Sequence, residues 1–162
     1  MFPESSGPIV AHLLRDQSDY MTFEITTALP SNEAEDPSMY DLFYVANTKC
    51  FLIEARARFR LPATDSTARV DVVKVADGAD PNSAGVSMLA STFNVASTAN
   101  RVQRKGPTAT LANAQLNPGN AVGFDTAGSM TDLRALVVTL LFGVDMKNIP
   151  FGQSVSTVIS GI

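Results

Sequence analysis

Residues 51–60 constrain the fold of this chain more than any other segment, because their side chains alternate strictly in character. Phe51, Ile53, Ala55, Ala57 and Phe59 alternate with Leu52, Glu54, Arg56, Arg58 and Arg60. Successive side chains of a β-strand point to opposite faces, so this period of two predicts a half-buried strand with the first five residues on its buried face. Pro62 ends the strand, since proline has no N–H to donate to a sheet.

Several other segments combine β-prone residues with flanking turn residues. We expect short strands at Met21–Ile25, Asp41–Ala46, Ala68–Val75, Thr108–Leu111, Ala121–Thr126 and Leu133–Phe142. Residues 77–82 and 116–120 have the composition of turns. Leu133–Phe142 is apolar on both faces, which is typical of a central strand. About seven strands separated by turns predict an all-β fold, a jelly-roll-like antiparallel β-sandwich with extended N- and C-terminal arms.

Two segments leave alternatives open. In Ala68–Val75 the apolar positions change parity at Val72, which is explained either by a β-bulge or by burial on both faces of the strand. Val86–Ala96 fits neither the helical nor the strand period, so a short helix and a bent strand are both compatible with it.

Three regions differ in composition and predict the domain organisation. Residues 1–38 are expected to form an N-terminal arm, residues 39–143 the sandwich, and residues 144–162 a C-terminal arm or strand. Apolar residues in the two arms are candidates for contact with other subunits, although covering their own sandwich is an equal alternative. These interface candidates are Phe2, Ile9, Met21, Phe23, Ile25, Phe151, Val155, Val158 and Ile159.

The charge composition argues for assembly and against nucleic-acid binding. Charged residues make up 17 % of the chain, below the usual ~25 %, which favours burial of surface against another chain. The net charge is −4, and a nucleic-acid binder normally carries a basic stripe. Arg56, Arg58 and Arg60 are the densest basic cluster, and we interpret them as a solvated or salt-bridged strand face, with an acidic partner as the lesser alternative.

Few features of the sequence indicate a cellular compartment or a membrane. The single cysteine, Cys50, cannot form an intramolecular disulfide and is expected to be buried, which is consistent with folding in a reducing cytoplasm. Residues 1–8 lack the features of a signal peptide. The longest apolar stretch, 135–144, is about half of the ~20 residues that span a bilayer, so no membrane partner is expected.

The sequence contains no convincing set of catalytic residues. His12 is the only histidine, so neither a nucleophilic triad nor a usual zinc site can be built around it. Glu54, Asp71 and Asp125 are the acids most able to converge as a glycosidase pair. Asp77, Asp80 and Asn82 could offer oxygens to calcium, but an Asx-rich turn explains them better. We therefore expect a non-enzymatic protein without cofactor or metal.

The central sequence resembles a known family. The segments that carry the likeness are Val70–Gly78, Gly85–Leu89, Ala99–Asn100, Ala109–Leu111, Leu116–Phe124 and Leu133–Leu141. Their phrases and order are similar to jelly-roll-like virion proteins of tailed phages, which occur as capsid decoration (cement) proteins and head-fibre bases. The resemblance runs from Thr48 to Phe142 and departs from the family at Asn120, where aspartate is usual; both arms lie outside it.

The resemblance implies a decoration protein of the virion, made in the host cytoplasm. Its implied partners are the major capsid protein, on whose outer surface it would bridge capsomers, and two further copies of itself in a homotrimer. A tail, neck or fibre component on the same sandwich is the first alternative. A glycan-binding attachment module is the second, although the chain has no tryptophan and only three tyrosines with which to stack sugars.

Overall fold

The computed structural model describes residues 20–28, 42–79 and 84–145, and confirms the expected all-β antiparallel sandwich. Its elements are β1 (Tyr20–Ala28), β2 (Tyr44–Val45), β3 (Cys50–Arg58), β4 (Arg69–Val75), β5 (Val86–Ser87), β6 (Phe93–Asn94), β7 (Gln103–Lys105), α3 (Leu111–Ala114), β8 (Gln115–Leu116), β9 (Ala121–Ala127) and β10 (Val137–Asp145). Among these residues no helix is long and apolar enough to cross a membrane.

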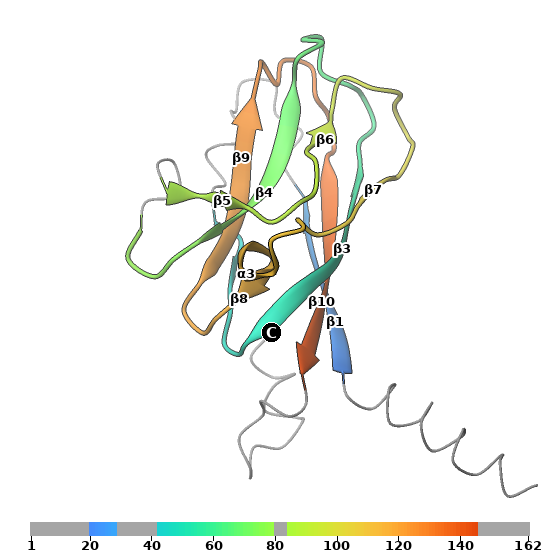
Figure 1. The fold of residues 1–162 in the computed structure, drawn as a ribbon. Helices are drawn as coiled ribbons and strands as arrows, with labels where there is room; N and C mark the ends of the chain where they lie inside the picture. The colour runs from blue at the N-terminus through green and yellow to red at the C-terminus, as the bar shows by residue number, and fades with distance from the viewer. Residues whose placement is uncertain (1–19, 29–41, 80–83, 146–162) are drawn as a thin grey trace, which may run out of the picture.

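The strands form two sheets. Sheet A has the order β1-β10-β3-β7, with β8 also paired to β3, and sheet B has the order β2-β9-β4-β5, with β6 also paired to β4. Figure 1 shows the two sheets as facing layers, with the chain from β5 to β7 and α3 crossing in front of the space between them. Every strand pair is antiparallel.

β3 has the predicted period of two, but its phase changes within the strand. Leu141 pairs with Glu54, whereas the next residue, Phe142, pairs with Leu52, so Ile53 is an extra residue in β3. This β-bulge reverses the parity of the side chains on either side of it. Cys50 and Leu52 are therefore buried together with Ala55, Ala57 and Phe59. The prediction that Phe51 and Ile53 share the buried face is wrong for this reason.

In β4 the alternative of burial on both faces is confirmed. Its register with β9 runs without a shift from Arg69↔Ala127 to Val75↔Ala121, which rules out a bulge at Val72. Val70 and Val72 belong to the main core between the sheets, while Val73 and Val75 form a second small cluster with Ala121.

The segment between β4 and β9 departs from the expectations in one place. Val86–Ala96 adopts the bent-strand alternative, because β5 and β6 each pair with β4. The strand predicted at Thr108–Leu111 is wrong. Leu111 starts the single turn α3 instead, in which the N–H of Asn113 donates to the carbonyl of Thr110 at 2.9 Å. The sequence of this turn, Leu-Ala-Asn-Ala, is rich in residues with high helix propensity.

β10 is the central strand of sheet A, as its two apolar faces predict, since it pairs with β1 on one side and β3 on the other. It starts at Val137 rather than Leu133, after Asp132 and Ala135 adopt positive φ angles of 67° and 51°. β1 lies inside the region 1–38 for which an arm is predicted, and all nine of its residues pair with β10.

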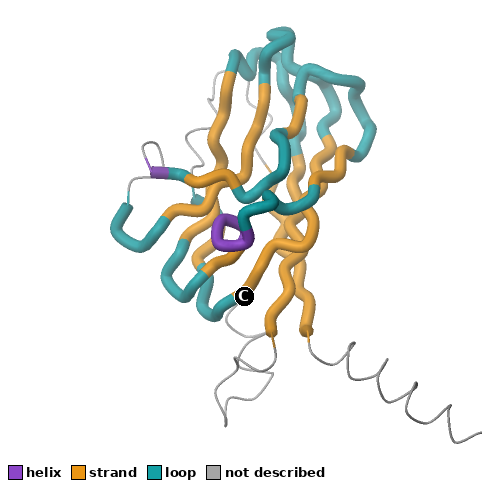
Figure 2. Tube along the Cα trace, viewed as in Figure 1, coloured by secondary structure: helices purple, strands orange, loops and turns teal. Residues whose placement is uncertain are grey.

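Three of the connections between the sheets, residues 59–68, 95–102 and 128–136, lie at one end of the sandwich, where Figure 2 shows the loops above the strands. Two of them lie side by side: residues 59–68 join β3 to β4, and residues 128–136 join β9 to β10. The carboxylate of Asp65 accepts hydrogen bonds from the N–H of Ser129 at 2.7 Å and of Thr67 at 2.8 Å.

Candidate functional site

Of the three acids proposed for glycoside cleavage, the structure brings two together, Asp71 and Asp125, and leaves Glu54 apart from them. Glu54 faces outward from sheet A, while Asp71 and Asp125 are paired across β4 and β9 in sheet B. A hydrogen bond from Arg56 is the main reason that the pKa of Glu54 is lowered, which is the opposite of what a catalytic acid requires. Glu54 is therefore in place for ion pairing and not for proton donation.

The pKa of Asp71 is raised. The main cause is burial, while the neighbouring charge of Asp125 adds a smaller contribution. Its Oδ1 accepts hydrogen bonds from the Ser87 hydroxyl at 3.0 Å and from the N–H of Val72 at 2.8 Å. The contact with Ser87 links β5 to β4, so the carboxylate of Asp71 has a structural role within its own sheet.

Other residues considered for chemistry are dispersed. The described part of the chain contains no cluster of three or more His, Cys, Asp or Glu side chains that could hold a metal ion. Of the calcium candidates, Asp77 lies in a described turn, whereas Asp80 and Asn82 lie outside the described residues, as does His12. Cys50 is buried, as predicted, and burial raises the pKa of its thiol to about 12.

The outer face of sheet A carries a group of charged residues that we call the arginine face: Glu54, Arg56, Arg58 and Arg60 along β3 and its extension, with Arg104 of β7. Arg56 pairs with Arg104 in the register of the two strands, and both guanidinium groups contact the carboxylate of Glu54. The Nη1 of Arg56 also lies 3.6 Å from the Oε1 of Glu24 on β1. The interpretation of Arg56 as part of a salt-bridged strand face is confirmed.

Arg58 and Arg60 differ from Arg56 and Arg104. Both are exposed, and neither forms an ion pair within the described part of the chain. Val137 lies directly opposite Arg58 on β10 and is 37 % exposed. Val102 precedes Gln103, which pairs with Ala57, and it is 52 % exposed beside the same end of β3. Positive charge and exposed aliphatic surface therefore alternate here.

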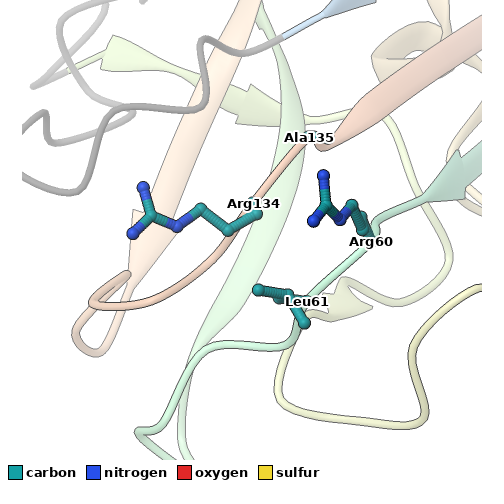
Figure 3. Close-up of a pocket in the computed structure, with 4 residues that line it drawn as sticks. All are labelled: Arg60, Leu61, Arg134 and Ala135. Carbon is teal, nitrogen blue, oxygen red and sulfur yellow. The ribbon is translucent and has the colours of Figure 1, made fainter.

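A hollow of about 260 Å³ adjoins these residues and is lined by Arg60, Leu61, Arg134 and Ala135. The N–H of Arg60 donates to the carbonyl of Arg134 at 2.9 Å, and the N–H of Arg134 donates to the carbonyl of Leu61 at 3.1 Å, so backbone pairing fixes its floor. In Figure 3 the guanidinium group of Arg134 points away from that of Arg60, and Leu61 lies below the two side chains. The hollow is thus a mixed polar and apolar recess and not a clamp for a small anion.

The predicted interface residues fall into two groups. Phe23 and Ile25 pack against the core of their own sandwich, and the ring of Phe23 lies 5.5 Å from that of Phe142 and 6.2 Å from that of Tyr44. Met21 is half-buried on the same strand. The other candidates, Phe2, Ile9, Phe151, Val155, Val158 and Ile159, lie outside the described residues.

Sequence reasoning identified the arginines of β3 but missed their apolar neighbours. Leu61, Val102 and Val137 come from three separate segments, and none of them stands out in its own segment. Leu61 follows Arg60 directly in the sequence, but only strand pairing shows that Val102 and Val137 lie beside Arg58. No local signal in the sequence would have indicated this grouping.

Comparisons with known proteins find similarity in structure alone. No family model matches the sequence, and no curated protein sequence matches it. A chain from the capsid of Ralstonia phage GP4 is similar in structure, with a TM-score of 0.55, 15 % identity, and coverage of 83 % of this chain and 86 % of that one. A chain from the capsid asymmetric unit of cyanophage Pam1 has a TM-score of 0.44 and 10 % identity over 78 % of this chain and 85 % of that one. The first of these likenesses shows a shared sandwich fold.

Proposed function

We propose that this chain is a structural protein of a tailed-phage virion that acts by binding and not by catalysis. The observation that carries the proposal is the shared fold with a chain of a phage capsid over 83 % of this chain. The sequence phrases that resemble phage decoration proteins, between Thr48 and Phe142, point to the same kind of protein. Together they favour a decoration or cement protein on the outer surface of the head, made in the host cytoplasm.

In this proposal the partners are the major capsid protein and two further copies of the chain. A head filled with DNA is under outward pressure, and a protein that bridges neighbouring capsomers stabilises it by burying surface across their seams. Phe23 and Ile25 pack on their own sandwich. The other interface candidates remain proposed contacts for these partners, because extended segments can bury large areas: Phe2, Ile9, Met21, Phe151, Val155, Val158 and Ile159.

The experiment has two readouts. Light scattering with size-exclusion chromatography should give three chains of 17.2 kDa each, about 52 kDa in total. The purified protein, added to heads that lack it, should bind them and raise the temperature at which they are disrupted, while heat-unfolded protein should not. A protein that binds isolated tails and ignores heads would contradict the decoration role and favour a tail, neck or fibre component.

Glycan binding has less support. The large apolar side chains exposed in the described part of the chain are all aliphatic: Leu42, Val45, Ile53, Leu61, Val86, Val102, Leu111 and Val137. Sugar sites usually offer an aromatic ring on which the sugar stacks, and the described rings of Phe23, Tyr44 and Phe142 pack on one another instead.

A further inference from the structure

Arg58 and Arg60 stand at one end of the outer face of sheet A without an ion pair to any described residue, in a chain whose net charge is −4. Arg56 and Arg104 are neutralised by Glu54, and Arg56 additionally by Glu24. Arg58 and Arg60 follow on the same face without such a partner in the described residues. A local positive field on an acidic molecule orients it toward an acidic partner and accelerates their encounter.

Exposed aliphatic side chains are concentrated at the same place. Of the eight large apolar side chains that are exposed in the described part, Leu61, Val102 and Val137 border Arg58 and Arg60. Arginine beside apolar surface is typical of protein–protein interfaces, whose centre is poor in other charged residues. A surface for single-stranded nucleic acid would instead offer aromatic rings on which bases stack, whereas the exposed apolar side chains here are aliphatic.

The hollow adds a place for an anchoring side chain. Its volume of about 260 Å³ is far larger than the ~30 Å³ that one water molecule occupies in the liquid. Leu61 and Ala135 give it apolar walls, and Arg60 stands at its edge (Figure 3). Anchors of this kind, set in a pocket with charges at the rim, carry most of the free energy of protein–protein binding.

We propose that the surface formed by Arg58, Arg60, Leu61, Val102 and Val137 docks an acidic segment of a protein partner, with carboxylates on the two arginines and an apolar side chain in the hollow. The inference rests on the proposed function, in which the partner is the outer surface of the phage head. It specifies the face of the sandwich that meets the head. It also requires carboxylates and an apolar side chain on the head at that place.

The test uses the full chain and purified heads that lack it, with dissociation constants measured by co-sedimentation. Arg58→Glu and Arg60→Glu should each weaken binding by about tenfold or more, because each turns attraction into repulsion. Lys49→Glu makes the same change of charge on an exposed residue just before the other end of β3 and should stay within about twofold of the wild type. Thermal unfolding of each variant should match the wild type, since all three side chains are exposed.

Further measurements distinguish the possible outcomes. Leu61→Ser should also weaken binding to heads, and added salt should slow association of the wild type more than that of Arg58→Glu. If the wild type binds heads and the Arg58, Arg60 and Leu61 variants bind equally well, the proposed surface is wrong while the proposed function stands. If the wild type does not bind heads, both are wrong. Binding to duplex DNA that is lost in Arg58→Glu would also overturn the inference, in favour of a nucleic-acid partner.

Discussion

Asp65 shows how one side chain holds together two neighbouring connections between the sheets, residues 59–68 and 128–136. Its carboxylate accepts hydrogen bonds from the Thr67 hydroxyl at 2.7 Å and from the N–H groups of Thr67 and Ser129. Gly128 allows this approach, because a Cβ at that position would lie 2.9 Å from the backbone of Ala68, and its φ is +76°. The loop end of the sandwich therefore depends on an ionised carboxylate.

The first prediction concerns the pH dependence of this contact. Hydrogen bonds from Ser129 and Thr67 lower the pKa of Asp65 from 3.8 to about 2. Because the folded pKa lies below the unfolded value, the contact stabilises the fold fully above about pH 4, and the stabilisation is lost as the pH falls through 2. Asp65→Asn should lower the Tm at pH 7 by about 3 °C and flatten the decline in Tm between pH 4 and pH 2.

Asp77→Asn is the matched control, because Asp77 is exposed in a turn, and it should leave both the Tm and its pH dependence unchanged. An Asp65→Asn variant whose Tm follows the wild-type curve at every pH would show that the carboxylate does not tie the two loops together.

Cys50 supplies the second prediction. It is 1 % exposed, and burial raises the pKa of its thiol to about 12, so at pH 8 the group is both inaccessible and protonated. A thiol reagent needs an accessible thiolate. We expect native protein at pH 8 to react at least about 100-fold more slowly than protein in denaturant. Equal labelling rates in the two states would contradict the buried position of Cys50.

At the scale of elements, the bulge in β3 depends on a glycine in the neighbouring strand β10. Phe51 faces outward and pairs with Gly143 of β10, where a Cβ would lie 2.6 Å from the Cζ of the Phe51 ring. The glycine therefore leaves room for the ring on the outer face. The alternation of β3 and the composition of β10 together determine where the phase changes.

The third prediction tests this fit. Gly143→Ala should destabilise the protein by about 1–2 kcal/mol, because the new methyl group and the ring cannot occupy the same space. The measurement is the free energy of unfolding in urea. In a chain that already carries Phe51→Ala, adding Gly143→Ala should lower the free energy of unfolding much less than it does in the wild type. Gly106→Ala, where a Cβ would meet nothing within 4 Å, is the matched control and should change stability by less than about 1 kcal/mol.

At the scale of the whole molecule, stability should be distributed unevenly between the centre and the margins of the sandwich. β10 lies between β1 and β3, and β4 pairs with β9 over seven residues. β5 and β6 each contribute two residues to the edge of sheet B, and β7 contributes three to sheet A. The long paired strands also supply most of the buried side chains.

The fourth prediction follows from this distribution. Amide hydrogen exchange should be slowest in β3, β4, β9 and β10, at a rate set by global unfolding, and faster in β5, β6 and β7, which open locally. Exchange measured by NMR at several urea concentrations distinguishes the two processes. Uniform protection of all strands would contradict it and indicate a single cooperative unit that includes the margins.

The sequence alone was sufficient for the fold class and for most of the strands. Period-two patterning and turn residues are local properties, so the strands at Ala121–Thr126 and Ala68–Val75 and the central position of β10 followed from them. The charged face along Arg56, Arg58 and Arg60 followed for the same reason, since alternation within one strand determines which residues share a face.

The tertiary structure alone decided the phase of β3, the single helical turn at Leu111 and the surroundings of the arginines. A bulge at Ile53 depends on the partner strand, which lies about 90 residues away in the sequence. Likewise, Val102 and Val137 lie beside Arg58 only because β7 and β10 pair with opposite edges of β3. Contacts between distant segments depend on register and topology, which no pattern within one segment can specify.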